Sequence, residues 1–142
     1  WNWKACAIPL ALTAIVLLEI YAKSMVHHPS PPFSMIKNPT TMFDKNYINE
    51  QFSYPSGHAA RAIFMALLSF VAVYWTNGLK RVVRYGLLVA LMCYVLLVSV
   101  SRIYLGHHWF SDVLGGLLLG TSFGFFITWM LVPWLPISQI HD

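Results

Sequence analysis

The stretch VVRYGLLVALMCYVLLVSVSRIY, residues 82–104, decides the fold class of this chain. Its charged residues are Arg84 and Arg102, near its two ends, and it is as long as the ~20-residue apolar helix that crosses a bilayer. Three further apolar stretches have a similar length: residues 3–25, 56–76 and 109–135. Because backbone polar groups inside the hydrocarbon must be satisfied within the segment itself, we expect four membrane-spanning helices rather than strands.

The composition supports the same conclusion. The chain has 142 residues, of which 58% are hydrophobic and 10% charged, whereas a soluble globular domain carries about 25% charged residues. This balance excludes a soluble domain, a disordered chain and a disulfide scaffold, and predicts one all-α polytopic membrane bundle over residues 1–142. Cys6 and Cys93 lie in apolar stretches, which predicts buried free thiols. The +4 net charge comes from scattered basic residues, so we expect no nucleic-acid partner.

The order of the helices predicts where the ionisable residues meet. Helices that alternate in direction bring the end of the first, the start of the second, the end of the third and the start of the fourth to one membrane face. The chemically interesting residues fall at these helix ends: Lys23, Ser56, His58, Arg102, His108 and Asp112. We therefore expect one site, built from four segments that are far apart in the sequence.

Loop charges predict the orientation of that site. The opposite face carries Lys4, Lys80, Arg81 and Arg84, and the loops of the site face carry Lys37 and Lys45. By the positive-inside rule, we expect the site to be extracytoplasmic. The short chain, without long extramembrane domains, favours a bacterial plasma membrane.

The first motif is YPSGHA, residues 54–59, at the start of the second apolar stretch. Proline and serine before an apolar run predict a helix start with Ser56 as its N-cap. Gly57 lets a ligand approach the backbone closely, and the free N–H groups of a helix N-terminus favour an anion. An ordinary helix cap followed by an interfacial histidine, His58, is the alternative interpretation.

The second motif is SRIYLGHHWFSD, residues 101–112. His108 and Asp112 are four residues apart at a helix start, so they share one face and can touch. A carboxylate on one imidazole nitrogen fixes the tautomer and leaves the other nitrogen free to attack. The fork of donors on Arg102 suits phosphate. The alternative is an interfacial arginine that pairs with Asp112.

Together the two motifs resemble the type 2 phosphatidic acid phosphatase superfamily, the lipid phosphate phosphatases, which share their core with vanadium haloperoxidases. The family pattern is K-x6-R-P, then P-S-G-H, then S-R-x5-H-x3-D, and the last two elements are complete in this chain. The first element departs, because Lys23 is followed at the family spacing by Ser30 instead of arginine. Two residues are candidates for the missing cation, His28 and Arg61. We favour Arg61, which lies on roughly the same helical face as His58.

The resemblance implies a function and a role for each motif residue. His108 would attack phosphorus and form a phosphohistidine, Asp112 would orient it, and His58 would protonate the leaving oxygen as general acid. Four groups would hold the phosphoryl oxygens: Lys23, Ser56, the Gly57 backbone and Arg102. No metal or other cofactor is implied. We also expect Glu19, one turn before Lys23, to pair with that lysine or with another buried cation.

The resemblance leaves several matters open. Family members have six membrane helices, so we expect this chain to lack the first two. Undecaprenyl diphosphate, phosphatidic acid and phosphatidylglycerol phosphate all suit such a site within a bilayer, and the oligomeric state is open. Two alternative functions are a phosphotransferase of the same family and a catalytically silent membrane scaffold or binding protein. A haloperoxidase is disfavoured because those enzymes are soluble.

Overall fold

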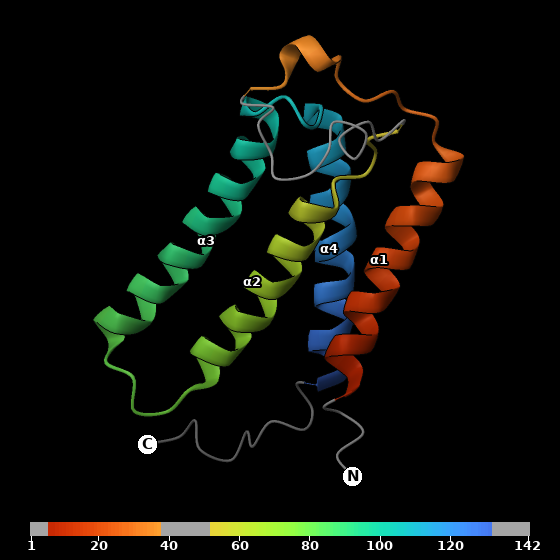
Figure 1. The fold of residues 1–142 in the computed structure, drawn as a ribbon. Helices are drawn as coiled ribbons and strands as arrows, with labels where there is room; N and C mark the ends of the chain where they lie inside the picture. The colour runs from red at the N-terminus through yellow and green to blue at the C-terminus, as the bar shows by residue number, and fades with distance from the viewer. Residues whose placement is uncertain (1–5, 38–51, 132–142) are drawn as a thin grey trace.

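The computed structural model describes residues 6–37 and 52–131, which form four long helices and one short helical turn (Figure 1). In chain order these are α1 (Ala7–Met25), η2 (Phe33–Met35), α2 (Gly57–Trp75), α3 (Arg81–Tyr104) and α4 (Phe110–Leu131). Each long helix is apolar and long enough to cross a membrane, and the described residues contain no strand. The predicted all-α membrane bundle is therefore confirmed. The predicted helix limits at residues 3 and 135 lie outside the described residues.

The connection between α3 and α4 is a tight turn. Gly106 has a φ of 73°, which is a left-handed conformation that a residue without Cβ adopts at little cost. The N–H of Gly106 bonds to the carbonyl of Ile103 at 3.0 Å, and that of His107 to the carbonyl of Arg102 at 3.1 Å. This pair of bonds is the Schellman arrangement that ends a helix. It brings the first residues of α4 directly beside the last turn of α3.

The segment around η2 lies over this turn. The N–H of Lys37 donates to the carbonyl of Leu105 at 3.0 Å. A side chain at Gly106 would also run into the backbone oxygen of Met35. The absence of a side chain at this position therefore serves two purposes, the left-handed turn and the close approach of the loop.

Helix α2 packs most extensively against α4. Three glycines of α4, Gly116, Gly120 and Gly124, are spaced four residues apart and face α2, because a Cβ at any of them would collide with it. At the first two positions the nearest atoms are the backbone oxygens of Ser56 and Ala60. Small residues at this spacing let membrane helices approach closely. They set the distance between the two helices that carry most of the site.

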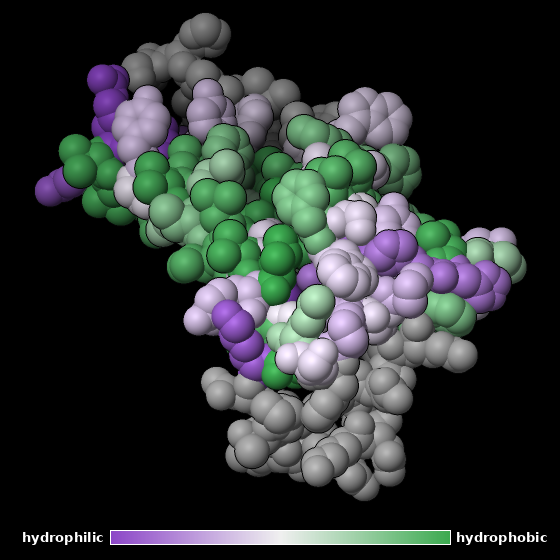
Figure 2. All heavy atoms as spheres, turned by 90° about the horizontal axis from the view of Figure 1, so that it is seen from above, coloured by the Kyte–Doolittle hydropathy of each residue, from purple (hydrophilic) through white to green (hydrophobic). Residues whose placement is uncertain are grey.

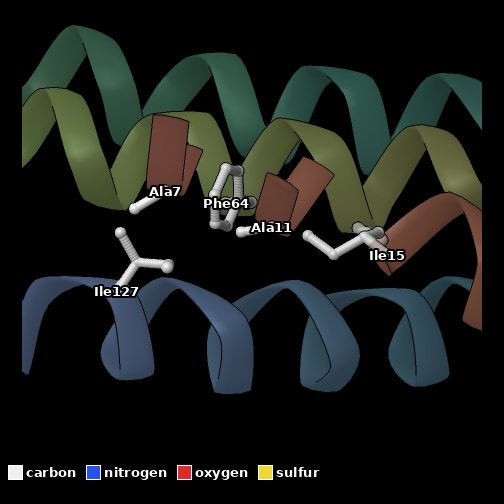
Figure 3. Close-up of a cluster of buried hydrophobic side chains, with 6 residues drawn as sticks. Ala7, Ala11, Ile15, Phe64 and Ile127 are labelled. Atoms are coloured by element: carbon white, nitrogen blue, oxygen red, sulfur yellow. The ribbon is translucent and has the colours of Figure 1, made fainter. Parts of the chain in front are cut away.

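Buried side chains of α1, α2 and α4 point toward one another on the other side of α2 from α3 (Figure 3). Phe64 of α2 and Ile15 of α1 are both fully buried. The complete cluster is Ala7, Ala11, Ile15, Ala60, Phe64 and Ile127. This packing involves the N-terminal half of α1, and one turn beyond it Glu19 lies against Gly57 at the start of α2.

The prediction for the two cysteines was half wrong. Cys6 and Cys93 are free thiols, as expected, but both are exposed on the surface of the chain. Lipid tails are as apolar as a leucine side chain, so a residue in an apolar membrane helix can face lipid as readily as protein. An apolar run therefore does not show which of its residues are buried against other helices.

Candidate active site

One end of the bundle brings together the end of α1, the start of α2, the end of α3 and the start of α4 (Figure 1). The N–H of Ser56 donates to the carbonyl of Asp112 at 2.9 Å, which joins α2 to α4. The indole N–H of Trp109 donates to the carbonyl of Pro29 at 2.9 Å, which joins the start of α4 to the segment after α1. Seen from above, this end shows polar side chains toward the middle of the view, with apolar ones beside them (Figure 2).

Asp112 and His108 form the centre of this end. Asp112 is fully buried, and its Oδ2 accepts the backbone N–H of Trp109 at 2.9 Å, so the carboxylate caps α4 from its third position. The same oxygen lies 3.6 Å from Nδ1 of His108, whose side chain is 9% exposed. At this distance the two atoms are close neighbours but too far apart for a hydrogen bond. Because the carboxylate faces Nδ1, Nε2 lies on the far side of the ring.

The second oxygen of the same carboxylate faces another histidine. Nδ1 of His28 lies 3.2 Å from Oδ1 of Asp112 and 3.5 Å from the hydroxyl of Ser53. Sequence reasoning missed this contact, because His28 belongs to a loop whose path no periodicity predicts. Its proposed role as a phosphate donor stays a prediction, while its described partner is Asp112.

Ser56 is the N-cap residue of α2, as predicted, but its hydroxyl makes no cap hydrogen bond. Burial against α4, rather than capping, holds this residue in place. The hydroxyl of Ser56 and Nε of Arg102 are both buried without a hydrogen-bond partner within residues 6–37 and 52–131. Arg102 is in the last turn of α3. Two phosphate-binding donors predicted from the motifs therefore lie unused at this end of the bundle.

His58 lies in the first turn of α2 with its ring exposed. No hydrogen bond among the described residues involves this ring. The ionisable side chains within electrostatic reach of it are Arg102, Arg61, His108 and Glu19. His58 therefore lies within electrostatic reach of Arg102 at the end of α3, of His108 just before α4 and of Glu19 on α1.

Glu19 of α1 holds two cations. Its Oε1 lies 3.3 Å from Nζ of Lys23, and its Oε2 accepts a hydrogen bond from Nη1 of Arg61 at 2.7 Å. The predicted pairing of Glu19 with Lys23 is confirmed, and Arg61 is a second partner. The carboxylate also lies against Gly57, where any Cβ would overlap it. Arg61 is thus close to the motif residues, and its described partner is a carboxylate.

The residues that the structure describes contain no cluster of three or more His, Cys, Asp or Glu side chains able to hold a metal ion.

A cavity of about 520 Å³ lies at the opposite end of α2 and α3, with Tyr74, Arg81 and Arg84 in its lining. It includes none of the motif residues, so we do not assign it to the site.

Comparison with known proteins agrees with the motifs. Residues 4–135 match the family model of the PAP2 superfamily. The chain is 34% identical over 132 residues to an undecaprenyl-diphosphatase of Sulfolobus acidocaldarius, covering 91% of this chain and 55% of that protein. It is 27% identical over 128 residues to phosphatidylglycerophosphatase B of Bacillus subtilis, covering 89% of this chain and 57% of that protein.

The chain therefore spans a little over half the length of these two relatives. A dihydrosphingosine 1-phosphate phosphatase of Schizosaccharomyces pombe is 25% identical over 130 residues, which cover 87% of this chain and 31% of that protein. No solved structure gives a significant match.

Proposed function

Because the chain belongs to the PAP2 superfamily, we propose that it is a membrane-embedded phosphatase that hydrolyses a lipid phosphate or diphosphate through a phosphohistidine on His108. The observation that carries this proposal is the fully buried carboxylate of Asp112, 3.6 Å from Nδ1 of His108. A buried carboxylate beside a histidine is the arrangement that orients an imidazole for attack.

The first step is attack on phosphorus by Nε2 of His108. A bond forms between this nitrogen and phosphorus, and the bond from phosphorus to the leaving oxygen breaks. The Asp112 carboxylate keeps the proton on Nδ1 and stabilises the positive charge that develops on the ring. In the second step, water attacks phosphorus, releases inorganic phosphate and restores His108.

His58 is the general acid of the first step. It donates its proton to the leaving oxygen, and it takes a proton from the attacking water in the second step. Its exposed ring, unbonded to any described residue, supports this role, as does its electrostatic contact with His108 and Arg102. A group that transfers a proton to substrate must be open to it.

The phosphoryl oxygens bind four groups in this proposal: Lys23, Ser56, the Gly57 backbone and Arg102. The buried, unpartnered hydroxyl of Ser56 and Nε of Arg102 support it, since buried donors normally have partners. Phosphoryl transfer is catalysed mainly by positioning and by stabilisation of charge, which such donors supply without a metal.

A lipid is the preferred substrate class. Exposed apolar side chains such as Ile103 and Tyr104 stand beside the site and offer contacts for acyl or isoprenyl chains. The names of the relatives favour undecaprenyl diphosphate and phosphatidylglycerol phosphate, and phosphatidic acid is the third candidate.

The test is phosphate release by the purified chain in detergent, with each of the three lipids and with a chelator present. We expect release to survive the chelator, to fall below detection in His108→Ala and to persist in His107→Ala, a matched control one residue away. After brief incubation with ³²P-labelled substrate, the parent should carry an acid-labile, alkali-stable phosphoryl group. Release by His108→Ala would refute the mechanism, and no release by a folded parent would favour a silent scaffold.

We also propose that the site faces the extracytoplasmic side. The support is the excess of basic residues at the other end, of which Lys80, Arg81 and Arg84 lie in the described part of the chain and Lys4 does not. In a variant with Cys6 and Cys93 replaced by alanine, a cysteine at the exposed Asn77 would then react with an impermeant thiol reagent only after the membrane is opened. Labelling in intact cells would show that the site faces the cytoplasm instead.

A further inference from the structure

Glu19 stands among groups that the proposed mechanism assigns to phosphate. Its two oxygens pair with Lys23 at 3.3 Å and with Arg61 at 2.7 Å. Its carboxyl group lies against Gly57, so closely that a Cβ there would overlap it. It is also within electrostatic reach of His58. A carboxylate therefore occupies a position bounded by two cations and the first residue of α2, a combination that suits a phosphoryl oxygen.

We propose that the Glu19 carboxylate is a resident anion that the substrate phosphate displaces, and that its displacement transfers Arg61 from Glu19 to phosphate. This inference rests on the proposed function, because it assumes that phosphate binds at Lys23 and Gly57. In this proposal, Arg61 binds the phosphate in place of the family arginine, whose position in this chain is occupied by Ser30. The cation is supplied from α2 instead of from the loop, and Glu19 holds it until substrate arrives.

Charge explains why the two anions compete. Glu19 faces the cations Lys23 and Arg61, and Arg61, Glu19 and Arg102 all act electrostatically on His58. A phosphate that takes Lys23 must come close to Glu19, and two like charges at contact distance repel each other strongly when partly removed from water. The phosphate therefore binds best when the carboxylate has turned away.

The ion pair of Glu19 and Arg61 is partly exposed. The side chain of Arg61 is 37% exposed, and that of Glu19 is mostly buried but still 12% exposed. Partly exposed ion pairs contribute little net free energy and can be exchanged for another partner. A phosphate offers Arg61 a charge-assisted contact of the same kind with more acceptor oxygens.

The experiment measures phosphate affinity with and without the carboxylate. Glu19→Gln keeps the size of the side chain and removes its charge. We expect the inhibition constant of inorganic phosphate, and KM for a short-chain lipid phosphate, to fall about tenfold, with no rise in kcat. Glu19→Asp keeps the charge and shortens the reach, so it should change both constants in the same direction by less. It is also a second variant should Glu19→Gln not fold.

A double substitution identifies the cation. In the Glu19→Gln background, Arg61→Gln should remove the gain in phosphate affinity, because the released arginine is what binds the phosphate. Lys80→Gln, which also removes one positive charge but lies at the other end of the bundle, should leave the gain intact. Size-exclusion profiles and thermal unfolding of each variant establish that it is folded.

The proposal would be overturned if Glu19 had only a structural role. If Glu19 only holds Lys23 and Arg61 in place, Glu19→Gln weakens phosphate binding and raises KM. Direct titration of the full chain with inorganic phosphate, followed by ³¹P NMR, separates the two hypotheses. If the parent hydrolyses lipid phosphate but Glu19→Gln binds phosphate no more tightly than the parent, the displacement is refuted and the proposed function stands. A parent that hydrolyses no lipid refutes the proposed function.

Discussion

Replacing Asp112 by asparagine tests the charge at the centre of the site while preserving its shape. Oδ2 of Asp112 accepts the N–H of Trp109 at 2.9 Å, so the amide oxygen of asparagine takes that position and keeps the helix cap. The same oxygen still faces Nδ1 of His108. What the variant lacks is the negative charge opposite the imidazolium that the proposed attack by His108 would form.

The distance sets the expected magnitude. A full charge 3.6 Å from Nδ1 interacts with an imidazolium by about 4–5 kcal/mol at an effective dielectric constant of about 20. Each ~1.4 kcal/mol is a tenfold change in rate, so this energy corresponds to about a thousandfold. Because polar neighbours recover part of the loss, we expect kcat to fall by about 10²- to 10³-fold. KM should change little, since Asp112 is not one of the proposed phosphate-binding groups.

The assay is steady-state phosphate release by the purified variant, with thermal unfolding in the same detergent. Asp112→Asn should unfold within a few degrees of the parent, whereas Asp112→Ala should be less stable because the N–H of Trp109 loses its acceptor. His28→Ala is the matched control, since His28 contacts the other oxygen, Oδ1. The reasoning is refuted if Asp112→Asn keeps kcat within about threefold, or if His28→Ala loses as much.

Two pairs of glycine substitutions test how the bundle positions the site. Gly120→Val should lower the unfolding temperature and the activity together, because its side chain would meet the backbone of α2, while Gly86→Ala, with nothing within 4 Å, should lower neither. Gly106→Ala should destabilise more than Gly78→Ala: both positions have a positive φ, but only the first is also covered by the loop after α1. Equal losses within either pair, measured by thermal unfolding, would contradict the packing argument.

Much of the fold was predictable because its signals are local. Four apolar stretches of bilayer length predict four helices, and their alternation in direction predicts that Lys23 and Arg102 meet at one end. The spacing of His108 and Asp112 predicts one helical face whatever the rest of the chain does. Helix ends were also close to expectation, since α3 ends at Tyr104, where the third apolar stretch ends, and Ser56 is the N-cap of α2.

The partners of the charged side chains were less predictable. Arg61 pairs with Glu19, which is 42 residues earlier in the chain, and His28 contacts Asp112 across an even longer separation. Neither pairing has a signature in spacing. Both depend on how closely α1, α2 and α4 approach one another, and the glycines of α4 allow the close approach of α2.

By itself, the sequence determined the membrane fold, the end of the bundle at which the motif residues gather and the proximity of His108 to Asp112, because hydrophobic length and helical periodicity act over neighbouring residues. Only the tertiary structure decided that the hydroxyl of Ser56 is buried without capping α2, and that Glu19 holds both Lys23 and Arg61. These contacts join different helices. Their geometry follows from side-chain packing between helices, which no single segment encodes.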